Sequence, residues 1–98
     1  GFIADSKLTV AQNNLQSIYT AQQEYKSNNA AYYNSGIGSN RTQYLNTALF
    51  NGSQILDVQS DYYYYTVAKS ATFTAYAYPR TAGLKRCTIN HLKNLNCD

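Results

Sequence analysis

A stripe of mostly apolar side chains recurs at helical spacing along the N-terminal part of the chain. Its members follow each other at intervals of four and three residues: Ala4, Leu8, Ala11, Leu15, Ile18, Gln22 and Tyr25, with Tyr19 and Ala21 widening the stripe. This spacing predicts one long amphipathic helix over residues 3–27, about 37 Å long at the α-helical rise. The helix should end within "SNNAAYYNSGIG", where asparagine and glycine permit a left-handed exit.

The stripe extends to the first residues of the chain, "GFIADSK". Asp5 or Ser6 would serve as an N-cap if the helix began later. A helix of this length that begins at the chain terminus suggests that the chain is cut from a longer protein. A second helix face, with Val10, Asn14 and Ser17, points away from the stripe and is expected to meet solvent or neighbouring molecules.

Residues 28–61 show no strong period, and a connection of that length inside a compact domain often carries function or a short element of its own. We predict a short helix at Thr42–Phe50, because Tyr44, Leu45, Ala48 and Leu49 fall on one side of it. The following "NGS" closes this helix.

The pattern then changes to period two. Residues 62–68 and 72–78 flank the connection "AKSA", which predicts an antiparallel hairpin whose second strand ends at Pro79. Because consecutive side chains of a strand point to opposite faces of the sheet, we expect one face to form the core and the other to be exposed to solvent. The expected core face holds Tyr63, Tyr65, Val67, Phe73, Ala75 and Ala77, and the expected wet face holds Tyr62, Tyr64, Thr66, Thr74, Tyr76 and Tyr78.

A third strand is predicted around residues 86–90, with Cys87 and Ile89 on one face. Cys87 and Cys97 enclose a short segment, which in a small exported protein indicates a disulfide. A zinc site with His91 and Asp98 as further ligands is the competing interpretation, although the spacing matches no recurring zinc pattern. The chain is therefore predicted to be a single α+β domain over residues 1–98, with a long helix packed on a small antiparallel sheet.

Charged residues make up only 13% of the 98 residues, and the polar surface is mostly amide, hydroxyl and phenol, which suits an extracytoplasmic protein. The net charge of +3 is concentrated in the C-terminal region, where Arg80, Lys85, Arg86 and Lys93 occur without an acid between them. These residues would bind a phosphate backbone weakly, or they form an ordinary solvated loop. One histidine, a single glutamate and no glycine-rich loop leave no nucleophile with an activating base, so we expect no enzyme, no metal and no cofactor.

Taken with the cysteine-bounded tail, two segments give the chain a family resemblance: "SKLTVAQNNLQSIYTAQQEYKSNN" and "YYYYTVAKSATFTAYAYP". The chain resembles the globular domain of a type IV pilin without its membrane-embedded helical half, as in the smaller pilins of Gram-negative bacteria. The resemblance implies that residues 28–61 are the αβ-loop and that residues 62–98 hold the sheet and the disulfide-bounded region.

The resemblance also implies a structural role. Such a subunit is anchored in the inner membrane, is handled there by assembly machinery through its N-terminal segment, and polymerises with other pilin subunits into an extracellular filament. The filament would serve adhesion, twitching motility or DNA uptake, with DNA or host or abiotic surfaces as further partners. A type II secretion pseudopilin and a minor pilin that binds DNA through its basic C-terminal region are the alternatives, and a calcium site would favour the pseudopilin.

Overall fold

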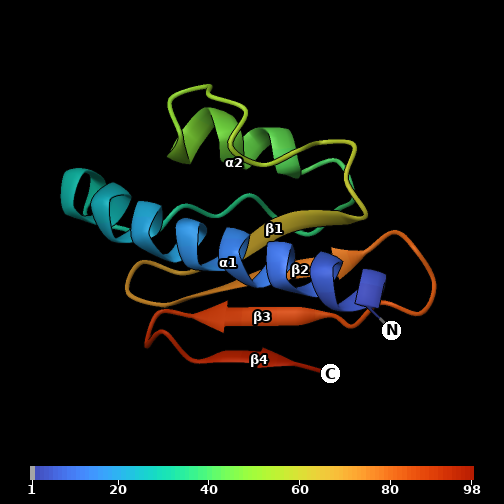
Figure 1. Cartoon of the computed structure of the whole chain (residues 1–98). Helices are drawn as coiled ribbons and strands as arrows, with labels where there is room; N and C mark the ends of the chain where they lie inside the picture. The colour runs from blue at the N-terminus through green and yellow to red at the C-terminus, as the bar shows by residue number, and fades with distance from the viewer. Residues whose placement is uncertain (1) are drawn as a thin grey trace.

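The protein is an α+β structure in which helices cover one face of a four-stranded antiparallel sheet (Figure 1). The computed structural model describes residues 2–98, with side chains described from residue 5 onward. The sheet has the strand order β1-β2-β3-β4, formed by Tyr62–Ala68, Phe73–Pro79, Cys87–Asn90 and Leu95–Cys97. Helix α1 (Phe2–Asn29) lies across the sheet, and helix α2 (Thr42–Leu49) lies on the β1 side.

The predicted long amphipathic helix is present, and its length matches the longest dimension of the molecule. Ala11, Leu15 and Ile18 are fully buried against the sheet. Its 28 residues span about 42 Å at the α-helical rise, and the longest dimension of the molecule is 42 Å. The helix runs two residues beyond the predicted end, and the left-handed exit falls on Ala30 (φ 63°) rather than on asparagine or glycine. Ala4 lies outside the described side chains.

The predicted hairpin is present, but the prediction of which tyrosines face the core is wrong. Tyr64 pairs with Ala77 and Thr66 with Ala75, so the β1 residues with even numbers share the helix-covered face with the odd-numbered residues of β2. That face holds the sheet's part of the core: Tyr62, Tyr64, Thr66, Phe73, Ala75, Ala77, Cys87 and Ile89. Tyr63 and Val67 therefore lie on the opposite, open face, as does Tyr65, which is buried there beneath its neighbours.

The open edge of β1 is covered by the αβ-loop. The amide of Tyr64 donates to the Thr42 hydroxyl (3.0 Å), that of Thr66 to the Ser35 hydroxyl (2.8 Å), and that of Ala68 to the Asn34 side chain (3.0 Å). Alternate amides on an edge strand point away from the sheet and need such partners when they are shielded from water. The loop thus acts as an irregular fifth member of the sheet.

Two buried side-chain amides hold the loop to the helices. The Gln22 amide donates to the Tyr33 carbonyl and its oxygen accepts from the Tyr33 amide, both at 2.8 Å. Asn46 makes the same double contact with the backbone of Leu56, at 2.8 and 2.9 Å. Each side-chain amide pairs with both the N–H and the C=O of one loop residue, as a neighbouring strand would. Because all of these polar groups are hydrogen-bonded, burying them costs little free energy.

The C-terminal region is held by a disulfide between Cys87 and Cys97, which pair directly across β3 and β4. This confirms the bridge that was predicted from the cysteine spacing, and the zinc interpretation of the two cysteines is wrong. Cys87 and Ile89 lie on the same buried face, as predicted. The short strand β4 was missed, because three residues are too few to show a period.

Candidate functional site

The four basic residues predicted as a contact surface do not lie together. Lys85 and Arg86 precede β3 and, with Tyr78 and Asp98, line a hollow of about 340 Å³ at one end of the sheet. Arg80 follows β2 at that same end, and its guanidinium donates to the carbonyls of Ser39 and Val58. Lys93 lies in the turn between β3 and β4, with its ammonium 5.7 Å from the ring centre of Tyr19 on α1. Three of the four basic residues therefore lie at one end of the sheet, and the fourth, Lys93, lies on the side of the molecule that α1 covers.

Four tyrosines form a cluster on the open face of the sheet, which we call the tyrosine quartet: Tyr63, Tyr65, Tyr76 and Tyr78. Cross-strand register places Tyr65 opposite Tyr76 and Tyr63 opposite Tyr78. The ring centres are 4.7 Å apart in the first pair and 5.4 Å in the second, with interplanar angles of 16° and 26°. Tyr63 and Tyr65 join the two pairs along β1 at 6.1 Å. These are offset-stacked arrangements, which add to the stability of cross-strand pairs.

The quartet differs from the tyrosines under the helix in how its hydroxyls are used. The Tyr62 hydroxyl donates to the Lys85 carbonyl at 2.7 Å, and the Tyr64 hydroxyl accepts from the Asn14 amide at 2.9 Å. Within the part of the chain that the structure describes, no protein group within hydrogen-bond distance engages a quartet hydroxyl. Burial raises the pKa of the Tyr65 phenol, and its neighbour Tyr76 raises that pKa further.

Two arginines border the quartet. The guanidinium of Arg80 lies 5.2 Å from the ring centre of Tyr63, within the range of a cation–π contact. Arg86 directly precedes Cys87, which pairs with Ala77, so continuing the antiparallel register places Arg86 beside Tyr78. Its guanidinium is 2.9 Å from a carboxylate oxygen of Asp98, and both side chains are well exposed. The site thus combines aromatic rings, phenol hydroxyls with no protein partner among the described residues, and a partly neutralised cationic rim.

The helix face predicted for filament packing is only partly free. Val10 is exposed at 55%. Asn14 is half-buried because its amide reaches the Tyr64 hydroxyl, and Ser17 is half-buried as well. Of these three positions, Val10 is the most exposed and the most available to a partner.

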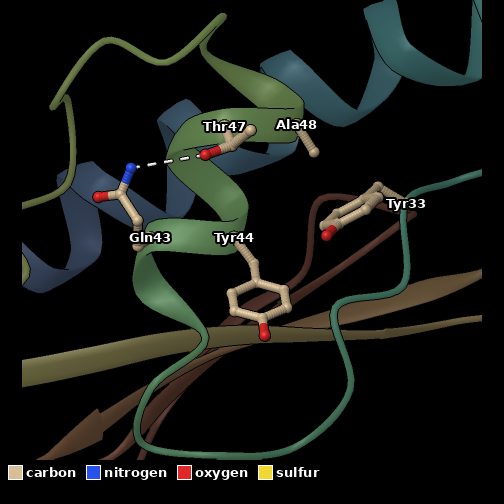
Figure 2. Close-up of a pocket in the computed structure, with 5 residues that line it drawn as sticks. All are labelled: Tyr33, Gln43, Tyr44, Thr47 and Ala48. Atoms are coloured by element: carbon tan, nitrogen blue, oxygen red, sulfur yellow. Dashed lines mark hydrogen bonds between the residues drawn. The ribbon is translucent and has the colours of Figure 1, made fainter.

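A shallow apolar groove lies beside α2, with a volume of about 300 Å³ (Figure 2). It is lined by Tyr33, Gln43, Tyr44, Thr47 and Ala48, and the Gln43 amide lies 3.5 Å from the Thr47 hydroxyl. The ring of Tyr44 points outward here rather than to the inner side of α2 that its spacing predicted, and it packs under the Arg41 guanidinium. Burial raises the pKa of the Tyr33 phenol, with Tyr25 and Tyr44 adding to the effect. The groove offers no acid, base or nucleophile at hydrogen-bond distance from another.

The acidic residues near the sheet are used in local contacts. Asp61 accepts from Lys7 at 3.3 Å and from the Thr81 hydroxyl at 3.1 Å, while Asp57 accepts from the amide of Gln59. Among the described residues, no group of three or more His, Cys, Asp or Glu side chains is placed to hold a metal ion. None of the described helices is long and apolar enough to cross a membrane.

Sequence reasoning missed the quartet as a unit, although its members were noted. Alternation in the first strand was read with the wrong starting residue, so Tyr63 and Tyr65 were expected inside the core. The signal that would have found the site is the pairing of two tyrosines from β2 with two from β1 at matched cross-strand positions. Comparison of the chain with protein-family models, curated proteins and solved structures finds no match.

Proposed function

We propose that this chain is the globular domain of a type IV pilus subunit that assembles into a filament through α1. The observation that carries the proposal concerns α1. This helix of 28 residues buries one of its faces on a four-stranded antiparallel sheet and leaves its opposite face uncovered. This is a pilin-like arrangement. In the resemblance, residues 28–61 would be the αβ-loop, the first two of which lie in α1, and the Cys87–Cys97 bridge would bound the disulfide region.

The proposed role is structural rather than enzymatic. In the parent protein an apolar helical segment would precede α1, anchor the subunit in the inner membrane and engage the assembly machinery. Packing of such segments in the filament core would supply the drive for assembly, since apolar burial is the dominant favourable term in association. The partners are then other pilin subunits, and the final location is an extracellular filament.

Val10 provides a direct test of assembly through α1. In the full-length parent protein, Val10→Glu should reduce filaments counted by electron microscopy, because it places a charge where a neighbouring subunit would pack. The matched control is Gln16→Glu, an exposed position on another part of the same helix. Thermal unfolding of the soluble domain should be unchanged by either substitution, because both positions are exposed.

Two results would overturn the proposal. One is normal filament number in the Val10→Glu variant. The other is a gene whose coding sequence has no apolar segment of about twenty residues upstream of "FIADSK". The pseudopilin alternative gains no support from the carboxylates, since Asp57 and Asp61 are engaged in local contacts.

A further inference from the structure

The rings of the tyrosine quartet stack on one another, and the two outer rings also have surface that no other quartet ring covers. Tyr76 stacks on Tyr65, and Tyr78 stacks on Tyr63, so each is an end member of the cluster. Tyr78 is exposed at 39%, whereas Tyr65 in the middle is exposed at only 7%. The central rings therefore support the outer ones, and the outer rings are held in place with one side uncovered by a quartet partner. Rigid, half-exposed aromatic rings lose little conformational entropy when a flat ligand stacks on them.

The charge around the quartet is positive. Arg80, Lys85 and Arg86 border the quartet at the Tyr78 end, and Asp98 is the carboxylate that faces them. Three cations against one carboxylate leave a net charge of two positive at this rim. On the rest of the open face, away from the Tyr78 end, the sheet carries uncharged polar side chains: Thr74, Thr88, Asn90 and Asn96. A ligand that complements this surface has flat unsaturated rings and a negatively charged chain.

We propose that the open face of the sheet binds single-stranded nucleic acid, with bases stacked on Tyr76 and Tyr78 and phosphates near Arg80 and Arg86. Domains that read single strands use a four-stranded sheet in the same way, with aromatic side chains on the open face stacking on bases. Charge and stacking together give binding that tolerates many sequences. This inference does not depend on filament assembly, because the isolated domain carries every residue involved.

A single strand fits this face better than a duplex does. Bases in a duplex are stacked on each other and cannot stack on a protein ring without being unpaired. Duplex recognition relies instead on an element that enters a groove. The sheet face offers rings and a short cationic rim, and α1 and α2 lie on its other side.

The experiment uses a fluorescein-labelled oligothymidylate of about 16 nucleotides and fluorescence anisotropy at low salt. Tyr78→Ala should weaken binding by about five- to 150-fold, the range for loss of one base–aromatic stack. Tyr78→Phe keeps the ring and should bind nearly as well as the original protein. Because Tyr78 is substantially exposed, both variants should keep the circular dichroism spectrum of the parent domain. Tyr78→Phe should also keep its unfolding midpoint, whereas Tyr78→Ala should lower the midpoint only by the loss of one stacked pair.

Charge variants separate this site from general electrostatic attraction. Arg86→Gln should weaken binding, and Asp98→Asn should strengthen it by releasing Arg86. Lys93→Gln is the matched control, since it removes one charge on the helix side of the molecule and should have little effect. Affinity should also fall as salt rises, because phosphate contacts release counterions.

Three outcomes would overturn the proposal. Equal weakening by Lys93→Gln and Arg86→Gln would show that only net charge matters. Equal affinity for a duplex of the same length would exclude base stacking. Competition by a sulfated polysaccharide as effective as the oligonucleotide would assign the face to acidic glycans instead. None of these results bears on filament assembly, so failure here and failure of the pilin proposal are distinguishable.

Discussion

The two faces of the sheet both carry tyrosines, yet they use them differently. Under α1, Tyr62 and Tyr64 insert their rings into the core and their hydroxyls meet Lys85 and Asn14. On the open face, the quartet rings stack on one another and their hydroxyls are left without protein partners in the described chain. Neighbours in one run of four identical residues therefore have different roles.

The difference teaches that cross-strand partners, rather than residue type, decide the role of a strand side chain. Tyr64 lies opposite Ala77, and the small alanine leaves room for the ring beneath the helix. Tyr65 lies opposite Tyr76, and these two rings stack on each other on the open face. Ala75 and Ala77 of β2 thus leave room for β1 tyrosine rings on the covered face.

The largest effect should come from truncating a tyrosine of the covered face, and truncating one of the open face should cost much less. Tyr64→Ala should lower the free energy of unfolding by about 3–5 kcal/mol, because it removes a fully buried ring. Tyr63→Ala should lower it by about 1 kcal/mol, the scale of one cross-strand aromatic pair. Urea unfolding followed by circular dichroism measures both values.

Tyr64→Phe sharpens that comparison, because it removes only the hydroxyl that accepts from Asn14 and should cost about 1 kcal/mol. Equal losses for Tyr63→Ala and Tyr64→Ala would mean that both faces are covered, contrary to the arrangement described here.

The disulfide should have the next largest effect, since it ties the short strand β4 to the covered face through Cys87. Replacing both cysteines with serine should lower the free energy of unfolding by about 2–4 kcal/mol. Intact mass of the protein purified and measured without reductant should be lower by two hydrogens than after reduction. Two free thiols in that protein would contradict the bridge.

The smallest effect is a loss of stability at alkaline pH. Burial raises the pKa of the Tyr62, Tyr64 and Tyr65 phenols above the ordinary tyrosine value. The folded protein then keeps protons that the unfolded chain releases, so stability is constant below the ordinary tyrosine pKa and falls as pH rises from there through the folded pKa. Tyr64→Phe should flatten this fall more than Tyr65→Phe, because Tyr64 is the more deeply buried. Unfolding midpoints across the alkaline range test this, and identical curves for the two variants would argue against it.

Local periodicity made much of the fold predictable. The helical stripe, the hairpin, the end of β2 at Pro79 and the shared face of Cys87 and Ile89 all follow from local spacing. The register of the hairpin did not, because four consecutive tyrosines contain no alternation to follow. Val67 and Thr66 then misled the choice, since apolar valine is exposed and polar Thr66 is buried with its hydroxyl donating to the Tyr33 carbonyl.

The candidate site was less predictable than the fold. Its residues come from two strands and from the segments after them, and the sequence gives no measure of how those segments bend. Lys93 was grouped with Arg80 by proximity in the chain, but the turn between β3 and β4 carries it to the helix side. A contact surface assembled from cross-strand neighbours needs the register before it can be recognised.

The covered edge of β1 has a consequence for how copies of this protein behave when crowded together. Amyloid growth and domain swapping by strand addition require an edge whose amides are free to pair with an incoming chain. Thr42, Ser35 and Asn34 already occupy the amides of Tyr64, Thr66 and Ala68, so the aromatic strand that would otherwise be the best template is closed. The opposite edge is β4, only three residues long, which offers an incoming strand too little backbone to nucleate a fibril. Both edges of this tyrosine-rich sheet are therefore poor templates for the addition of a further strand.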